Sequence, residues 1–189
     1  GSISHNLGFR ESDQKPISKK ALFDAFSEMV SFYEEGEVDV ILLEMMYVPS
    51  RMLPLFECVF SSKLPVWCGL SAKRSSQNSK ITGYSDQQIP LIDNIEEATN
   101  FGFEGMGIMH SSVDLIADTI ELIKTKHDGL IMAYPDSGYF KSPNWQFEEI
   151  ITPDHLTEFA NQWKQAGANI IGGCCGLGPE HTEALCRLR

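Results

Sequence analysis

Basic residues are scarce in this sequence. Its 189 residues include 15 Lys and Arg against 26 Asp and Glu, which gives a formal net charge of −11. Such a surface repels nucleic-acid phosphates and anionic lipid headgroups, and no basic stripe offsets it. The composition therefore argues against nucleic acids and membrane surfaces as partners and favours small molecules and other proteins.

Long apolar runs and a recognisable leader are also missing. No uninterrupted apolar stretch reaches the roughly 18–20 residues of a membrane span, and the opening GSISHNLGFRES has neither the basic nor the apolar region of a signal peptide. Five cysteines is an odd number without the spacing of a disulfide-rich secreted domain. We therefore expect a cytoplasmic protein with reduced thiols, folded as one domain over residues 1–189.

Short apolar runs alternate with helical patterns along the chain. Five runs predict buried strands, at residues 38–46, 65–72, 102–110, 129–138 and 168–176. Apolar residues at three- and four-residue spacing predict helices at 18–35, 49–61, 93–100 and 112–126, and after Thr152 and Pro179. Strands that alternate with helices predict an α/β protein with a parallel sheet covered by helices.

Polar residues gather where the predicted strands end. They are Glu44, His110, Asp136 with Ser137, and Cys174 with Cys175. β/α barrels build their active sites at the carboxyl ends of their strands, whereas the glycine-rich motifs GxGxxG and GxxxxGK of nucleotide-binding sheets are absent here. The polar segment 73–88 is long enough to form a mobile loop over such a site.

Cys174 and Cys175 are neighbours in the segment GGCCG. Adjacent Cα atoms are about 3.8 Å apart, whereas an unstrained disulfide needs roughly 4.4–6.8 Å, so a bridge between them is disfavoured. In a regular strand their side chains would point to opposite faces, but Gly172, Gly173 and Gly176 permit backbone angles closed to other residues. We interpret the pair as zinc ligands; the alternative is packing, because free Cys is among the most buried residue types.

A zinc site needs another ligand from elsewhere in the chain, and His110 is our candidate. It ends the apolar run GMGIMH, where the predicted strand should reach the open end of the sheet. The alternative for a lone His is a hydrogen bond to nearby backbone. Cys58 lies in a predicted helix and Cys68 in a predicted strand, and we expect both to pack in the interior. Cys186 belongs to the terminal helix, where we expect a structural or exposed thiol.

The stretch ITPDHLTEFANQWKQAGANIIGGCCGLGPEHTEAL combines a Trp before a Gly-Ala turn, a GGCC core and a Pro-Glu-His helix start. Upstream lie YPDSG at 134–138 with Trp145 beyond it, LLEMM at 42–46 and GIMHSS at 107–112. Together these segments resemble the homocysteine S-methyltransferase family. Its corresponding segments are Tyr-Pro-Asn-Ser-Gly with a downstream Trp, a strand that ends in Glu-Thr, and Gly-Val-Asn-Cys. The likeness extends over about residues 1–189 and is most specific in the last third.

This resemblance implies a parallel (β/α)8 TIM barrel in which three cysteines hold one zinc ion, and a substrate thiol such as homocysteine binds the ion and accepts a methyl group. Cys174 and Cys175 match two of the ligands, and His110 stands in the place of the third. Met109 replaces the Asn before that third cysteine, and Asp136 replaces the Asn of Tyr-Pro-Asn-Ser-Gly.

Three residues near the predicted zinc site are expected to contact substrate. The resemblance implies that Glu44 helps to hold the amino group of homocysteine, and its place after three apolar residues should point it into the barrel mouth. Asp136 is the second; the alternative for it is a loop cap or a pair with Lys. Tyr134, like Trp145, can stack on a cationic methyl donor, and the alternative for both is a core or lid position.

His110 changes the charge of the implied site. Zn²⁺ with three thiolates carries one net negative charge, whereas two thiolates and a neutral imidazole leave it neutral. Two Cys and one His is an accepted catalytic zinc set, so we expect metal binding with slower methyl transfer, or a different thiol substrate. A sulfonium or ammonium donor is cationic, and a negatively charged pocket favours its binding.

The chain covers only the later part of such a barrel. About five βα units are predicted, and the first three units of the barrel have no counterpart. Two sheet edges are then left unpaired, and we expect a homo-oligomer, another chain or the rest of a longer protein to cover them. A second hypothesis is a degenerate, non-catalytic barrel that binds a small ligand or a partner chain. A zinc hydrolase is a third, and it needs a general base, for which Glu44 and Asp136 are available.

Overall fold

A computed structural model describes residues 1–4, 17–85, 87–141 and 146–188. Trp145 lies outside the described residues. The main sheet has six parallel strands in the order β1-β2-β3-β5-β6-β9. These strands are β1 (Ser2–Ser4), β2 (Ile41–Met46), β3 (Val66–Arg74), β5 (Gly105–Ser112), β6 (Leu130–Asp136) and β9 (Ile170–Ile171).

Two short antiparallel pairings complete the described strands. The strand β4 (Ile81–Gly83) pairs with the end of β3. The strands β7 (Tyr139–Lys141) and β8 (Gln146–Glu148) form a separate two-stranded sheet after β6. Both pairings therefore follow the carboxyl ends of parallel strands, which is the end of the sheet where the polar residues gather.

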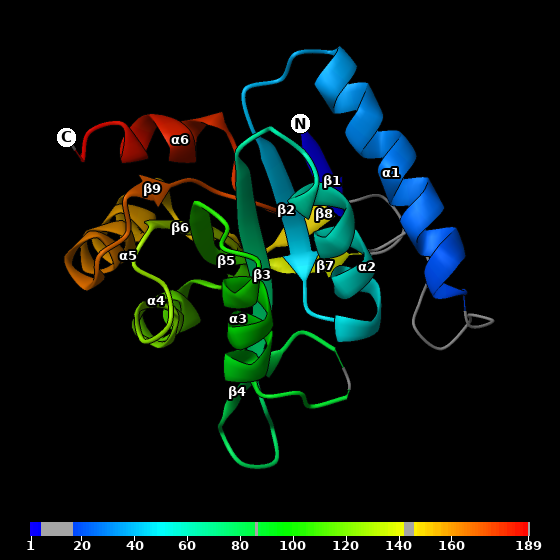
Figure 1. Cartoon of the computed structure of the whole chain (residues 1–189). Helices are drawn as coiled ribbons and strands as arrows, with labels where there is room; N and C mark the ends of the chain where they lie inside the picture. The colour runs from blue at the N-terminus through cyan, green and yellow to red at the C-terminus, as the bar shows by residue number, and fades with distance from the viewer. Residues whose placement is uncertain (5–16, 86, 142–145, 189) are drawn as a thin grey trace.

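A helix follows each parallel strand and covers the sheet (Figure 1). The helices are α1 (Lys19–Glu35), α2 (Pro49–Phe60), α3 (Leu91–Asn100), α4 (Ile116–Lys124), α5 (Pro153–Ala166) and α6 (Pro179–Leu185). Local signals set several starts: the hydroxyls of Ser18 and Thr152 accept hydrogen bonds from the first turns of α1 and α5, and α2, α5 and α6 begin with Pro.

The core lies between the sheet and these helices. Side chains alternate between the two faces of a strand, and in β2 Ile41 and Leu43 are fully buried in one cluster with helical residues such as Phe56 and Trp163. Leu42 and Glu44 alternate with them and are only partly buried. The inner face of the sheet therefore carries Glu44, while the helix-covered face carries the core.

The predicted alternation of strands and helices and the parallel sheet are confirmed, with three corrections. The count of five strands is one too few, because β1 is only three residues long and gave no apolar run. Segment 73–88 is not one irregular loop, since β3 continues to Arg74 and pairs with β4. The strand predicted at 168–176 ends at Ile171, and the chain turns at Cys175 and Gly176.

The sheet does not close into a barrel within the part of the chain that the structure describes. There, β1 and β9 each pair with a single neighbour and form its two edges. The described residues supply six of the parallel strands that a barrel of eight would need. None of the described helices combines the length and the apolarity that crossing a membrane requires.

Candidate metal centre

His110 lies in β5, near its carboxyl end, and comes together with Cys174 and Cys175, which follow β9. One ring nitrogen of His110 and the two Sγ atoms all lie within 4.8 Å of one another. The two Sγ atoms are 3.7 Å apart. Ligands of a tetrahedral zinc ion with ordinary bond lengths lie about 3.3–3.8 Å apart, so the sulfur pair already has the spacing of two such ligands.

The backbone after β9 continues along β6 before it turns. The N–H of Cys174 donates to the carbonyl of Pro135 at 2.7 Å, and the carbonyl of Cys175 accepts from the N–H of Ser137 at 2.9 Å. These two hydrogen bonds fix the cysteines against the end of β6. The turn at Cys175 and Gly176 then interrupts the strand alternation that would place the two sulfurs on opposite faces.

Gly176 is the glycine that this turn requires. Its φ is +81°, and a Cβ added there would lie 1.9 Å from the carbonyl oxygen of Ser137. A residue with a side chain would be strained at this φ and its Cβ would clash with the Ser137 carbonyl, so only glycine fits here. Gly172 and Gly173 do not have positive φ, so the expectation that all three glycines supply unusual backbone angles holds for Gly176 alone.

His110 reaches the cysteines through an irregularity in β5. Met109 pairs with Tyr134 but Ser112 pairs with Asp136, so β5 has one more residue than β6 over this span. The φ of His110 is +43°, an uncommon value for a residue with a side chain. Bulges of this kind bend a strand and redirect side chains, and here the bulge includes the candidate ligand.

Two neighbours contact the imidazole of His110. Asp136 Oδ2 lies 3.5 Å from His110 Nδ1, and this nitrogen is buried without a hydrogen bond in the described structure. The ring of Tyr84, which follows β4, lies with its centroid 4.8 Å from that of the imidazole. The ring of Tyr47 packs edge-on against Tyr84 at 5.9 Å. The imidazole is therefore flanked by the tilted ring of Tyr84 and, near Nδ1, by the carboxylate of Asp136.

The surroundings disfavour negative charge in the absence of a cation. Burial, and then the neighbouring Cys175, raise the pKa of the Cys174 thiol to about 12. Burial raises the pKa of the Asp136 carboxyl, and His110 partly opposes this effect. Burial followed by the charges of Asp136 and Cys175 raises the pKa of Tyr84. For the two thiols, a divalent cation would make the anionic form the favoured one, because coordination deprotonates them.

Glu44 and Tyr134, two of the predicted substrate contacts, face the same inner side of the sheet. The Ser2 hydroxyl donates to the Glu44 carboxylate. The Tyr134 hydroxyl is buried without a hydrogen-bond partner, and burial followed by the charge of Glu44 raises its pKa. A Cβ on Gly69 would lie 2.1 Å from that hydroxyl oxygen, so only glycine at 69 leaves room for the phenol.

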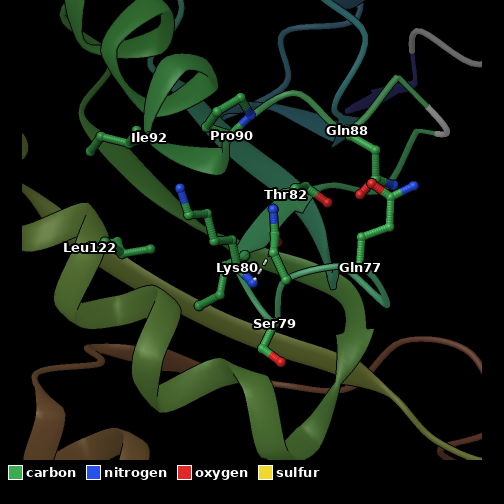
Figure 2. Close-up of a pocket in the computed structure, with 10 residues that line it drawn as sticks. Gln77, Ser79, Lys80, Thr82, Gln88, Pro90, Ile92 and Leu122 are labelled. Atoms are coloured by element: carbon green, nitrogen blue, oxygen red, sulfur yellow. Dashed lines mark hydrogen bonds between the residues drawn. The ribbon is translucent and has the colours of Figure 1, made fainter.

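Two cavities lie near the sheet, and one of them adjoins the metal cluster. One of about 460 Å³ adjoins the cluster, because Asp136 lines it together with Tyr139, Glu149 and His155. The other, of about 590 Å³, lies between the β3–β4 hairpin and the helices α3 and α4 (Figure 2). None of the six predicted site residues lines the second cavity, so it stands apart from the metal cluster.

Sequence reasoning missed Tyr84 and Ser2. Tyr84 falls in the polar segment that we expected to be a loop, and its contact with His110 depends on the β3–β4 hairpin. Ser2 lies in the short strand β1 and meets Glu44 through strand pairing. Neither residue has a local sequence signal. Cys58 and Cys68 are buried and Cys186 is exposed, as expected.

Comparison with known proteins agrees with this architecture. The family model described as "Homocysteine S-methyltransferase" matches residues 1–188. The selenocysteine methyltransferase of Astragalus bisulcatus is 24% identical over 184 residues, which cover 91% of this chain and 51% of that protein. Homocysteine S-methyltransferase 1 of Arabidopsis thaliana is 35% identical over 60 residues, which cover 30% of this chain and 18% of that protein.

A solved structure has the same fold. The homocysteine methyltransferase MmuM from Escherichia coli, in its metallated form, superposes with a TM-score of 0.71 at 19% sequence identity, over 93% of this chain and 54% of that chain. The present chain thus spans about half the length of MmuM and of the selenocysteine methyltransferase. Because the family model covers almost every residue, the chain belongs to the homocysteine S-methyltransferase family.

Proposed function

We propose that this chain is the zinc-binding part of a methyltransferase that moves a methyl group onto a thiol or selenol, with homocysteine as the first acceptor to test. The observation that carries this proposal is the approach of one imidazole and two thiols to within 4.8 Å, in a chain that belongs to the homocysteine S-methyltransferase family. The names of the relatives, which refer to homocysteine and selenocysteine, support the acceptor class.

The donor set fits zinc. Two thiols and one imidazole are a known catalytic combination for this metal, with a fourth position open to a substrate. The two Sγ atoms are 3.7 Å apart, which suits two ligands of one ion, and burial raises the pKa of the Cys174 thiol to about 12, so a nearby cation would favour its anionic form. His110, Cys174 and Cys175 would hold the ion. When bound, zinc lowers the pKa of a coordinated acceptor thiol, so that a nucleophilic sulfur is available near neutral pH.

The other site residues position the two substrates. Glu44 holds the ammonium group of the acceptor amino acid, and the Ser2 hydroxyl fixes the carboxylate. The buried Tyr134 hydroxyl gives the acceptor a hydrogen-bond partner. Asp136 places negative charge at the entrance where a cationic donor arrives.

In the reaction itself, the acceptor sulfur attacks the methyl carbon of a sulfonium or ammonium donor in line. The new S–C bond forms as the bond from carbon to the donor atom breaks, and its electron pair leaves with a neutral thioether or amine. The acceptor thiol loses its proton to solvent before this step. The protein contributes by holding the two substrates in the attacking geometry.

His110 sets the rate. An imidazole in place of a third thiolate leaves the bound acceptor sulfur less electron-rich, so transfer is slower than with three thiolates, or the site prefers a different thiol. A His110→Cys variant should therefore transfer methyl groups faster than the unaltered chain. Several sulfonium and quaternary ammonium donors, tested with homocysteine and selenocysteine, would measure this difference.

Metal content tests the proposal directly. The chain purified under reducing conditions should contain about one zinc ion, and fewer than about 0.1 per chain would contradict the site. Zinc without any methyl transfer, in both the unaltered chain and His110→Cys, would instead favour the rival hypothesis of a degenerate barrel that binds a small ligand or a partner chain. A reducing cytoplasm would keep the thiols of Cys174 and Cys175 available for metal.

A further inference from the structure

Among the described residues, His110 is the one side chain with a basic nitrogen within ion-pair distance of the Asp136 carboxylate. The two side chains are mostly buried, with 24% and 21% of their surfaces exposed, and Asp136 Oδ2 lies 3.5 Å from His110 Nδ1. Within residues 1–4, 17–85, 87–141 and 146–188, no Lys or Arg forms an ion pair with this carboxylate. Lys141, which follows on β7, pairs with Glu148 instead.

The pairing of β5 with β6 brings His110 and Asp136 together. The extra residue in β5 between Met109 and Ser112 shifts the pairing so that Ser112, rather than Ser111, stands beside Asp136. His110 lies within that shift and has a φ of +43°. Strain of this kind persists only where the surrounding structure holds it, and here Tyr84 packs on the imidazole from one side.

We propose that Asp136 is the positioning residue of His110. No hydrogen bond to Nδ1 forms in the described structure, but the Asp136 carboxylate lies 3.5 Å away, and with metal bound it would accept a hydrogen bond from Nδ1–H and leave the lone pair of the other ring nitrogen to the metal. This inference rests on the proposed zinc site. A carboxylate behind a metal-bound histidine fixes the tautomer and the ring orientation and makes the ligand more basic. A neutral imidazole carries one negative charge less than a thiolate ligand. The Asp136 carboxylate supplies that charge next to the site.

This role differs from the substrate contact that we expected for Asp136 from the sequence. A residue that only contacts substrate leaves metal affinity unchanged when it is altered. Substitution of a residue that acts through His110 changes the metal affinity as long as His110 is the ligand. The same substitution has no effect once a cysteine has replaced the histidine. The two roles therefore separate in a double-mutant cycle.

The experiment measures the zinc affinity of the whole chain by competition with a chromophoric chelator, for the unaltered protein, D136A, D136N, H110C and the combination of H110C with D136A. D136A should weaken zinc binding by about 10–100-fold. D136N should weaken it less, because its amide oxygen still accepts the hydrogen bond without the charge. In the H110C background, D136A should change the affinity by no more than about twofold.

D39A is the matched control, because Asp39 is exposed and precedes β2 at the opposite end of the sheet. It should leave zinc affinity unchanged. The absorption spectrum of bound Co²⁺ should keep its intensity in D136N, because the set of ligand atoms stays the same. In the metal-free protein, ¹⁵N NMR should show the His110 proton on Nδ1, and this measurement needs no substitution.

The outcomes of this experiment distinguish failure of the proposed function from failure of the role proposed for Asp136. An unaltered chain that binds neither zinc nor Co²⁺ would overturn the proposed function and this inference with it. Normal binding, combined with an equal loss for D136A in the His110 and H110C backgrounds, would overturn the inference alone and make Asp136 a direct ligand or a general electrostatic influence. Normal binding with no loss in D136A, or an Nδ1 without its proton, would also overturn it.

Discussion

The Sγ atoms of Cys174 and Cys175 lie 3.7 Å apart on the same side of the chain, although the two residues are adjacent. A continuous strand would have pointed them to opposite faces. The turn at Cys175 and Gly176 removes that constraint, and the hydrogen bonds of Cys174 to Pro135 and of Ser137 to Cys175 hold the result. The metal hypothesis depends on this arrangement, and its parts can be altered separately.

Removal of either sulfur should empty the site. Cys174→Ser or Cys175→Ser replaces a soft thiolate ligand by a hydroxyl, so zinc content should fall from about one per chain to less than about 0.1. Elemental analysis after gel filtration measures this. Cys186→Ser is the control, because that thiol is exposed and outside the cluster. Retention of zinc in both cluster variants would place the metal elsewhere.

Gly176→Ala should disrupt the turn itself. The new Cβ would meet the Ser137 carbonyl, and φ of +81° is unfavourable for alanine, so the free energy of unfolding of the metal-free chain should fall by at least about 2 kcal/mol. Urea unfolding in the presence of a chelator measures it. Gly102→Ala is the control: its φ is also positive, at +66°, but its Cβ would have no neighbour within 4 Å. That variant should lose only about 1 kcal/mol.

The sequence predicted the layered α/β fold, and the approach of His110 to the two cysteines, more fully than it predicted the shape of the site. Apolar runs and helical spacing are local signals, and so is the glycine-flanked cysteine pair. Tyr84 and Ser2 reach the site only through strand pairing, and the bulge at His110 is a property of two strands together. The relation between His110 and Asp136 was therefore not predictable from either residue's surroundings in the sequence.

The open sheet predicts association of the chain. β1 and β9 each lack a second neighbour among the described residues, and unpaired strand edges readily pair with another chain. Light scattering during gel filtration should therefore give a mass above the 21.1 kDa of one chain, rising with concentration. A mass of one chain at every concentration up to about 1 mM would contradict this expectation.

The Tyr134 hydroxyl should matter for substrate rather than for folding. It has no hydrogen-bond partner in the described structure, so Tyr134→Phe should leave the metal-free chain as stable as before, or more stable by up to about 1 kcal/mol. Tyr33→Phe is the control, because that hydroxyl donates to the carbonyl of Ser2 at 2.6 Å, and its loss should cost about 1 kcal/mol.

Gly69 provides a second test of the same hydroxyl. A Cβ at Gly69 would lie 2.1 Å from the Tyr134 hydroxyl oxygen and 3.1 Å from the Leu43 carbonyl. Gly69→Ala should therefore destabilise the chain, and Tyr134→Phe should recover part of the loss, with a coupling of about 0.5–3 kcal/mol. If the phenol also contacts the acceptor, Tyr134→Phe should raise KM for the thiol while zinc content stays the same. An unchanged KM together with clear coupling would mean that Tyr134 only fills the space that Gly69 leaves.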